Sequence, residues 1–325
     1  MVAGVTFKRG ARAVFHKAGG LRLVRWMHRK GLRILMYHRF SDSAGLENQC
    51  RHIRENYSPV SLAQVDAWLR CGDPLPMNAL AVTVDDGYRD FGAVAYSIFA
   101  AWRIPVTVYL VSDFLDGKLW LWVDQVKFAF LHSPLRRFRT ELSGGRVLEF
   151  SLETLEQRRA AARQTCEALK RQPNQVRLSV LASLAESLQI VIPVTPPAGD
   201  APLGWEDVRQ MARGIVTFGA HTRTHPVLSR VSGEDELYRE IEGSKRRIQE
   251  ALDGPVDHFC YPNGGPSDIT PECVEVVRRA HFRTAVTTQT GLNYAADNSF
   301  LLRRIGVEPA LDTLYFEQCA AAFHV

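Results

Sequence analysis

The feature that most constrains the fold is the alternation of short apolar runs with amphipathic segments. Each run is too short and too uniformly apolar for a half-exposed strand, and is therefore typical of the interior of a parallel sheet. Strand, helix, strand repetition predicts an α/β fold, either a barrel or an open sheet. The apolar runs lie at 33–38, 79–84, 106–111, 215–220, 256–261 and 283–288, and helical patterns lie between them at 88–103, 234–252 and 271–282.

One long segment interrupts this alternation. From about 117 to 200 there is no strong strand pair, and the patterns at 117–130, 151–170 and 175–189 are helical. The Pro-rich stretch IPVTPPAGDAP closes the segment, which indicates a return to the main domain. The predicted organisation is an N-terminal arm at 1–30 and one domain at 31–325, with a helical insertion at about 117–200.

The charge is distributed unevenly along the chain. At 325 residues and 46% hydrophobic the chain can bury a large core. The net charge is +5, but ten Lys or Arg residues precede the first acidic residue, Asp42, which leaves 30 basic against 35 acidic residues. Apolar and basic residues interleave between Val14 and Arg29. This arm is either a basic amphipathic helix at a membrane surface or an ordinary solvated helix.

Several classes of protein are disfavoured. No run of 18 apolar residues predicts a membrane span, and the N-terminus lacks the apolar core of a signal peptide. No nucleic-acid-binding motif accompanies the basic arm. The cysteines form no CxxC pair, which favours reduced thiols and a cytoplasmic protein, with any membrane contact made peripherally by the arm. The six cysteines are Cys50, Cys71, Cys166, Cys260, Cys273 and Cys319.

Two motifs supply candidate metal ligands. TVDDGYRD (83–90) places Asp85 and Asp86 at the end of a buried strand, where α/β enzymes hold their sites. GAHTRTHPVLSR (219–230) places His221 and His225 four residues apart, on one side of a predicted helical turn. With Asp86 they form a two-histidine, one-carboxylate set for a divalent metal. The alternatives are a helix-capping aspartate and structural histidines.

A third motif, HFCYPNGGPSD (258–268), follows another strand. Pro262, Asn263 and Gly264 form a tight turn. Its backbone N–H groups can point into the site formed by the other two motifs, as an oxyanion site requires. Pro-Asn-Gly is also simply a good turn.

The order TVDDG, HTRTHP and YPNGG resembles the polysaccharide deacetylase family, also called the NodB homology family of carbohydrate esterases. The resemblance runs from about Gly31 to Val307, apart from the insertion. It implies a distorted (β/α) barrel of about seven strands, and a metal-dependent hydrolase, with zinc favoured by the N/O ligands, that removes N-acetyl groups from an amino-sugar polysaccharide or glycan precursor. It also implies a role for each matched residue: Asp85 the general base, Asp86, His221 and His225 the metal ligands, the Asn263 N–H the oxyanion donor, and Tyr261, Pro262 and Gly264 the substrate-groove backbone.

The chain departs from the family pattern at two places. Cys260 stands where family members often carry an arginine that braces the base, and SFLLRRIGVEP (299–309) lacks the histidine that often supplies the acid. A branch resembling the biofilm-polysaccharide deacetylases is permuted, and its acid histidine follows a tyrosine at an N-terminal strand end. His38 in RILMYHRF fits that role, and Arg304 is the predicted substitute brace. The alternatives are a core histidine and a surface arginine.

Other functions stay open at this point. The same residues suit an O-acetyl or formyl sugar deacylase, and a fold that has lost catalysis would be a glycan-binding homologue. A non-haem iron oxygenase also uses two histidines and a carboxylate, but leaves the second aspartate unexplained. The expected partner is an acetylated glycan, with no nucleic acid.

Overall fold

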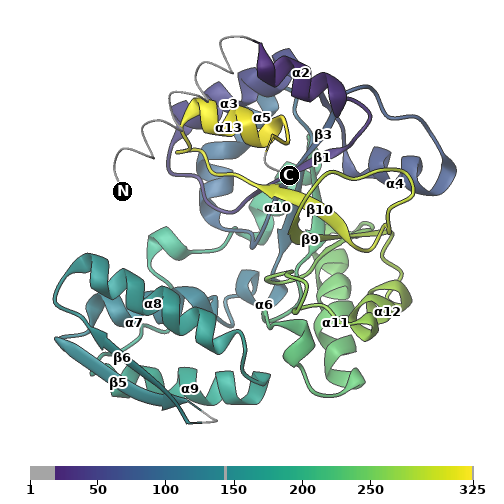
Figure 1. Ribbon diagram of the computed structural model, residues 1–325. Coiled ribbons are helices and arrows are strands. Elements are labelled where there is room, and N and C mark those ends of the chain that lie inside the picture. The colour runs from purple at the N-terminus through teal and green to yellow at the C-terminus, as the bar shows by residue number, and fades with distance from the viewer. Residues whose placement is uncertain (1–18, 143–144, 324–325) are drawn as a thin grey trace.

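Seven parallel strands close into a barrel. A computed structural model describes residues 19–142 and 145–323. The ring runs β1-β10-β9-β8-β7-β4-β3 and closes because β3 also pairs with β1 (Figure 1). The α/β barrel is therefore confirmed over the open sheet. The strands are β1 (Arg33–Tyr37), β3 (Ala79–Val84), β4 (Val106–Leu110), β7 (Val216–Ala220), β8 (His258–Cys260), β9 (Thr284–Thr290) and β10 (Leu302–Gly306), with the short β2 (Ser58–Pro59) added beside β3.

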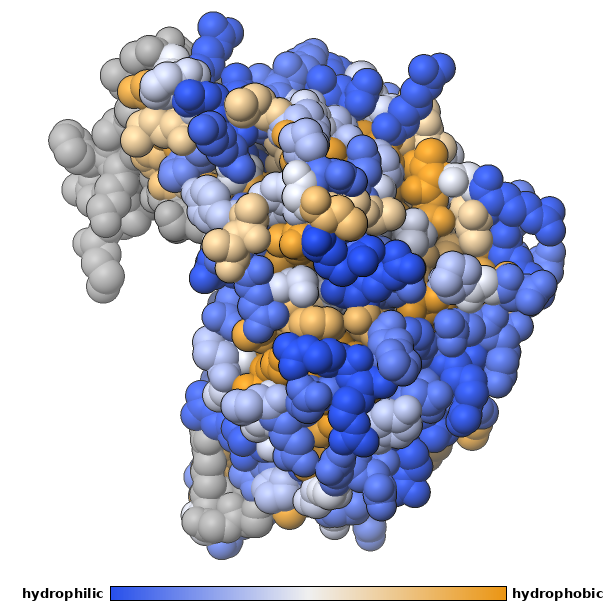
Figure 2. Space-filling model, turned by 90° about the vertical axis from the view of Figure 1, so that its right-hand side faces the viewer, coloured by the Kyte–Doolittle hydropathy of each residue, from blue (hydrophilic) through white to orange (hydrophobic). Residues whose placement is uncertain are grey.

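Both faces of the barrel strands are buried, which explains their mostly apolar sequences. On β1, Ile34 joins a cluster that includes Ala81, whereas the next residue, Leu35, joins the large cluster under the helices. Successive side chains point to opposite faces of a strand, so a strand buried on both faces is mostly apolar, and a polar side chain within it needs a buried partner, as Arg304 on β10 has in Thr83. The surface in Figure 2 is correspondingly mostly hydrophilic, with hydrophobic residues in scattered groups.

Helices surround the ring. Two of them coincide with the predicted helical patterns at 234–252 and 271–282, namely α11 (Glu234–Leu252) and α12 (Pro271–Arg279). The pattern at 88–103 forms a π-helical turn, η1 (Phe91–Ala95), followed by α5 (Tyr96–Ala101). The other elements around the ring are α2 (Gly20–Met27), α3 (Ser43–Asn56), α4 (Leu62–Cys71), α6 (Ser112–Leu115), α10 (Trp205–Ala212), α13 (Thr313–Ala320) and the 3₁₀ turns η2 (Ala198–Asp200) and η3 (Leu228–Arg230).

The segment predicted as a helical insertion lies to one side of the barrel and has its own apolar core (Figure 1). The absence of a strand pair was a wrong prediction, because the segment contains an antiparallel hairpin. Polar and apolar residues alternate in RFRTEL, as in a half-exposed strand, and a search for uniformly apolar runs misses that pattern. The segment consists of α7 (Trp122–His132), β5 (Arg137–Leu142), β6 (Arg146–Ser151), α8 (Leu155–Leu169) and α9 (Asn174–Ser187).

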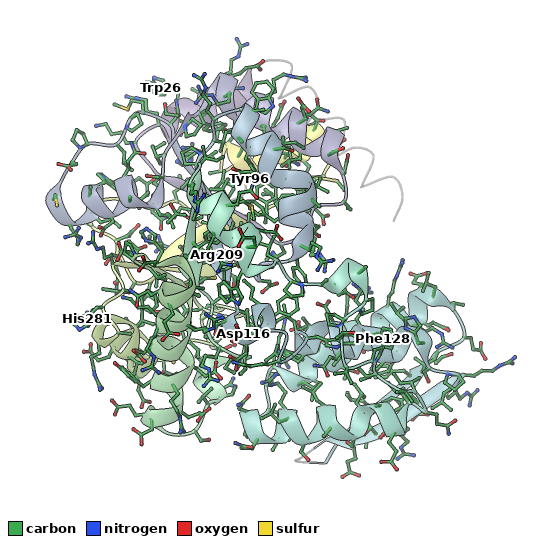
Figure 3. The ribbon with its side chains drawn as sticks, turned by 180° about the vertical axis from the view of Figure 1, so that it is seen from behind. Trp26, Tyr96, Asp116, Phe128, Arg209 and His281 are labelled. Atoms are coloured by element: carbon green, nitrogen blue, oxygen red, sulfur yellow. The ribbon has the colours of Figure 1, made fainter. Side chains whose placement is uncertain are left out.

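An ion-pair network holds the entrance to this segment. Asp116, labelled in Figure 3, accepts hydrogen bonds from Arg247 Nη2 at 2.7 Å and from Trp205 Nε1 at 2.9 Å. The contacts tie the chain leaving the barrel to α11 and α10. The bounds of the insertion at 117 and 200 stay a prediction.

Only part of the predicted N-terminal arm falls within the described residues. Residues 1–18 lie outside them, and α2 covers the rest of the amphipathic pattern. Leu23, Trp26 and Met27 are exposed along one side of α2, and Trp26 lies at the outer edge of the molecule in Figure 3. Within residues 19–142 and 145–323, no helix combines the length and the apolar character needed to cross a bilayer.

The barrel requires glycine at position 219. A Cβ there would lie 2.7 Å from the backbone carbonyl oxygen of His258, on the neighbouring strand β8. Because that oxygen belongs to the barrel wall, we expect Gly219→Ala to lower the free energy of unfolding by about 1–3 kcal/mol. Urea denaturation measures this, and Gly199→Ala, where a Cβ meets nothing within 4 Å, is the control. Equal stability of the two variants would contradict the prediction.

Candidate active site

The candidate residues converge at the carboxyl ends of the barrel strands. His38 follows β1, the pair Asp85 and Asp86 follows β3, and His221 follows β7. All these strands are parallel, so their carboxyl ends share one rim of the barrel. Residues more than 180 positions apart in sequence are therefore brought to one place, as the sequence predicted.

Asp85 is held by a buried arginine. Arg304 Nη1 donates to Asp85 Oδ1 and Arg304 Nη2 donates to Asp85 Oδ2, both at 2.7 Å, and the two side chains are 0% and 2% exposed. Burial alone would raise the pKa of Asp85, but the charge and hydrogen bonds of Arg304 outweigh it and hold that pKa well below its usual value. The predicted contact between Arg304 and Asp85 is present; the brace role stays a proposal.

Asp86 and the two histidines form a second, unsatisfied group. Asp86 Oδ1 lies 3.5 Å from His221 Nε2 and 3.4 Å from His225 Nε2, and is buried without a hydrogen-bond partner in the described structure. Donor atoms bound tetrahedrally to zinc at about 2.0–2.1 Å lie roughly 3.4 Å apart. Burial, reinforced by the neighbouring Asp85, raises the pKa of Asp86 well above its usual value, as expected for a carboxylate that lacks its cation. The donor set fits a divalent metal.

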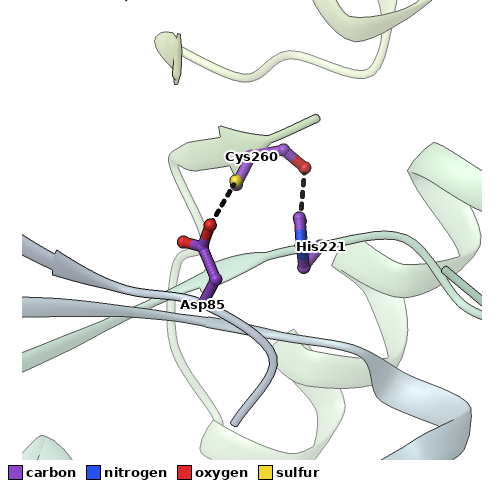
Figure 4. Close-up of side chains that lie close together, drawn as sticks. All are labelled: Asp85, His221 and Cys260. Carbon is purple, nitrogen blue, oxygen red and sulfur yellow. Dashed lines mark hydrogen bonds between the residues drawn. The ribbon is translucent and has the colours of Figure 1, made fainter. Parts of the chain in front are cut away.

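The tautomer of His221 suits ligation. Its Nδ1 lies 2.7 Å from the carbonyl oxygen of Cys260 (Figure 4), which can only accept, so Nδ1 carries the proton. Nε2, 3.5 Å from Asp86 Oδ1, is then unprotonated and can act as a metal ligand together with that oxygen. Burial lowers the pKa of His221 to about 4, which keeps the ring neutral. Burial, followed by the nearby His221, lowers the pKa of His225 well below its usual value.

Strained backbone, not a helical turn, brings the two histidines together. The predicted helical turn at 221–225 is wrong, because this segment is a loop in which Thr222 (φ 66°) and His225 (φ 58°) are left-handed. Asp86 (φ 74°) and Asn263 (φ 62°) share this conformation. Non-glycine residues in this region cost free energy and cluster at functional sites. The ring centroids of His221 and His225 still lie 4.8 Å apart.

Cys260 occupies the space next to Asp85. Its Sγ lies 3.5 Å from Asp85 Oδ2 (Figure 4). The same sulfur lies 3.2 Å from Arg304 Nη2. Asp85, His221 and Cys260 are also close enough to share a cation. That set fits less well, because Arg304 already occupies both oxygens of Asp85, whereas Asp86 Oδ1 has no partner. Burial raises the pKa of the Cys260 thiol well above its usual value, so the sulfur stays protonated.

His38 lies at the solvent-exposed edge of this group of residues. Its Nε2 is 3.7 Å from Asp85 Oδ2, and its side chain is 44% exposed whereas that of Asp85 is 2% exposed. Desolvation of the ring lowers the pKa of His38, and the charge of Asp85 opposes that shift. The pairing of β1 with β3 therefore brings His38 beside Asp85, and the exposed His38 ring is open to a ligand.

The turn after β8 presents backbone more than side chains. No described group accepts a hydrogen bond from the Asn263 N–H. At Gly264 (φ 65°) a Cβ would lie 2.8 Å from the Thr288 nitrogen. Tyr261 is 1% exposed and packs on Phe259, with ring centroids 5.2 Å apart, and Pro262 is also buried. Any contact of Tyr261 with a substrate is thus limited to its backbone, and the substrate role of this turn stays a proposal.

The sequence patterns did not predict the polar contacts that surround Asp86, His221 and His225, here called the metal set. Tyr88 donates to Asp124 Oδ2 at 2.5 Å, and Trp122 Nε1 donates to the His225 carbonyl oxygen at 3.2 Å. Arg39 lies 3.9 Å from the Tyr88 ring and binds Asp90. The sequence does show Tyr88 directly after the DDG motif. Asp124 and Trp122 come from the insertion, and sequence spacing gives no sign that α7 packs here.

The sequence matches a known family over part of its length. A family model described as polysaccharide deacetylase matches residues 154–285, which include both histidines and the turn at 261–264 but not Asp85 and Asp86. The poly-beta-1,6-N-acetyl-D-glucosamine N-deacetylase of Escherichia coli K12 is 33% identical over 115 residues. Over these residues the chain resembles the polysaccharide deacetylase family. The match covers 32% of this chain and only 16% of that longer relative.

Solved structures of deacetylases share the fold. Streptococcus pyogenes deacetylase PplD in complex with acetate matches with a TM-score of 0.59 at 16% identity, covering 89% of this chain and 98% of that one. IcaB from Ammonifex degensii matches with a TM-score of 0.59 at 17% identity, covering 90% and 96%. The BpsB deacetylase domain of Bordetella bronchiseptica gives 0.54 at 16% identity, covering 86% and 96%. At these identities the likeness establishes the barrel alone.

Loss of one histidine tests the metal set. We expect purified wild-type protein to carry about one divalent ion per chain and His221→Ala to carry little, because two protein ligands hold such an ion poorly. Inductively coupled plasma mass spectrometry measures the metal content. His132→Ala, which removes an exposed histidine of the insertion, is the control. Full occupancy in His221→Ala would refute the ligand set.

Replacing Arg304 tests whether this residue keeps Asp85 deprotonated. In Arg304→Met, burial acts on Asp85 without its counter-charge, so the pKa of Asp85 rises above its usual 3.8. The base is then protonated at higher pH, and the acidic limb of the pH profile of kcat/KM moves to higher pH. Arg303→Met, at a half-exposed neighbour, should leave the limb in place. Circular dichroism checks that both variants fold, and an unmoved limb in Arg304→Met would disprove the assignment.

Proposed function

We propose that this protein is a polysaccharide deacetylase, a metal-dependent hydrolase that removes N-acetyl groups from an amino-sugar glycan. The observation that carries the proposal is the pairing of two carboxylates with opposite environments. Arg304 occupies both oxygens of Asp85, whereas Asp86 Oδ1 has no protein partner and faces two imidazole nitrogens. One carboxylate is thus available as a base, and the other awaits a cation.

The residues of the metal set would hold a divalent ion, with zinc favoured by two nitrogen donors and one oxygen donor. When bound, such an ion lowers the pKa of a water and polarises an acetyl carbonyl. Asp85 then takes the proton of the attacking water, because Arg304 keeps it ionised. The backbone N–H of Asn263 donates to the oxygen that gains negative charge.

His38 completes the reaction by protonating the departing amine nitrogen. An amine leaves poorly unless it is protonated, so amide hydrolysis needs an acid at that position. The exposed ring beside Asp85 is accessible to a bulky sugar at the mouth of the site. The products are acetate and a free amino sugar.

The substrate class rests on the named relative, whose name specifies poly-beta-1,6-N-acetyl-D-glucosamine. An O-acetyl or formyl sugar deacylase would use the same residues, and acetate or formate release across matched substrates separates these activities. A glycan-binding homologue without activity would release neither. Cytoplasmic location and a peripheral membrane contact of the arm stay predictions.

Replacing His38 tests the acid with a matched pair of substrates. His38→Ala should lose about 10²- to 10⁴-fold in acetate release from an N-acetylglucosamine oligomer. It should lose far less on 4-nitrophenyl acetate, whose leaving group departs without a proton. His132→Ala should resemble wild type on both. Equal losses on the amide and the activated ester would show that His38 is not the acid.

A further inference from the structure

A groove of about 500 Å³ runs between α7 and α8 in the insertion. The two helices lie side by side in Figure 1. Val123, Ala162 and Cys166 line its apolar part, and Asp124 is buried in its wall. The charged residues around it are Lys127, Arg159, Arg163, Glu167 and Lys170.

The groove is connected to the active site through the first turn of α7. Asp124, in the groove wall, accepts the hydrogen bond from Tyr88, two residues after Asp86. Two residues earlier, Trp122 donates to the carbonyl oxygen of the ligand His225. The first turn of α7 thus borders both the groove and the residues around the metal set.

Two cations of the groove, Arg159 and Arg163, have no counter-ion within the described residues. Lys127, in contrast, lies close enough to Asp124 for its charge to oppose the rise that burial causes in the pKa of that carboxyl. Lys170 pairs with Glu167 at 2.6 Å. The two arginines make no ion pair and no hydrogen bond through their side chains to any residue of the described ranges. Asp124 is the remaining acid, and burial raises its pKa despite the hydrogen bond from Tyr88. The groove therefore presents more positive than negative charge to a ligand.

The cations come from separate positions on the two helices. Arg159 and Arg163 are four residues apart on α8, so they project on one side about 6 Å apart, and Lys127 comes from the facing helix. A single phosphate is bound best by donors that converge on it. Charges in a row suit a chain whose anions are also spaced, and the alkyl stems of Lys and Arg pack on the C–H faces of sugars.

We propose that the groove binds a carboxylate-bearing sugar unit next to the acetylated amino sugar, so that the substrate is an acidic glycan. The inference rests on the proposed deacetylation. Guanidinium groups bind carboxylates in a bidentate fashion, which fixes the chain as well as attracting it. The same cations repel the free amines of a deacetylated product. A neutral homopolymer of N-acetylglucosamine gains nothing from this groove.

The test compares glycans of equal length with the metal-loaded full chain. Heparosan oligosaccharides alternate N-acetylglucosamine with glucuronate, and N-acetylglucosamine oligomers are their neutral counterparts. We expect a higher kcat/KM on the acidic oligomers, falling as salt rises. The double variant R159E/R163E should lose about tenfold or more of kcat/KM on the acidic oligomers, through KM, and little on the neutral ones. R137E/R139E, with the same charge change on the exposed hairpin, is the control.

Calorimetric binding of the same oligomers separates this inference from the proposed function. Salt-sensitive binding of heparosan oligomers that R159E/R163E weakens supports the groove even if no acetate is released, an outcome that refutes only the deacetylation. Equal kcat/KM and equal binding for acidic and neutral oligomers, or an unaffected double variant, overturns the inference. Preference for a lipid-phosphate-linked amino sugar over heparosan, with the same sensitivity to R159E/R163E, overturns it in favour of a phosphate ligand.

Discussion

The buried pair of Arg304 and Asp85 is the interaction on which the site depends. The two residues come from β10 and β3, the strands on either side of β1, so the pair lies across the strand at which the barrel closes. Arg304 also donates to the Thr287 carbonyl oxygen at 2.7 Å and to Thr83 Oγ1 at 3.1 Å. Removing one partner of a buried pair costs about 3–5 kcal/mol, because it leaves a charge uncompensated. Closure of the barrel and ionisation of Asp85 are therefore coupled.

The same pair gives the adjacent aspartates, Asp85 and Asp86, two different environments. Asp85 accepts one hydrogen bond from Arg304 on each oxygen and stays ionised with a further lone pair on each, whereas Asp86 has a left-handed backbone and keeps an oxygen without a partner. Two carboxylates side by side cannot both be ionised in a buried site unless each has a cation. The arginine supplies one, and the histidine set beside Asp86 has the donors for the other.

The insertion participates in the site at close range. Its first helix, α7, provides Trp122 to the His225 carbonyl oxygen and Asp124 to Tyr88. The backbone of His225 is held in a strained conformation, and such strain persists only where surrounding contacts fix it. The segment that forms the groove thus also supports a candidate metal ligand, which links substrate binding to metal geometry.

The sequence by itself determined six of the seven barrel strands and the motifs at their ends, because a strand buried on both faces is mostly apolar and the carboxyl ends of parallel strands form the rim that holds the site. The pattern of apolar runs did not predict β10, whose sequence LRRIG contains two arginines. The sequence also identified His38 and Arg304 as candidates, because they stand in for the acid histidine and the bracing arginine that the usual family motifs would supply. Only the tertiary structure decided that Arg304 reaches Asp85, that a strained loop and not a helical turn joins the two histidines, and that Trp122 and Asp124 support them. Those contacts join residues far apart in the chain, and neither periodicity nor local spacing records which distant side chains a closed barrel brings together.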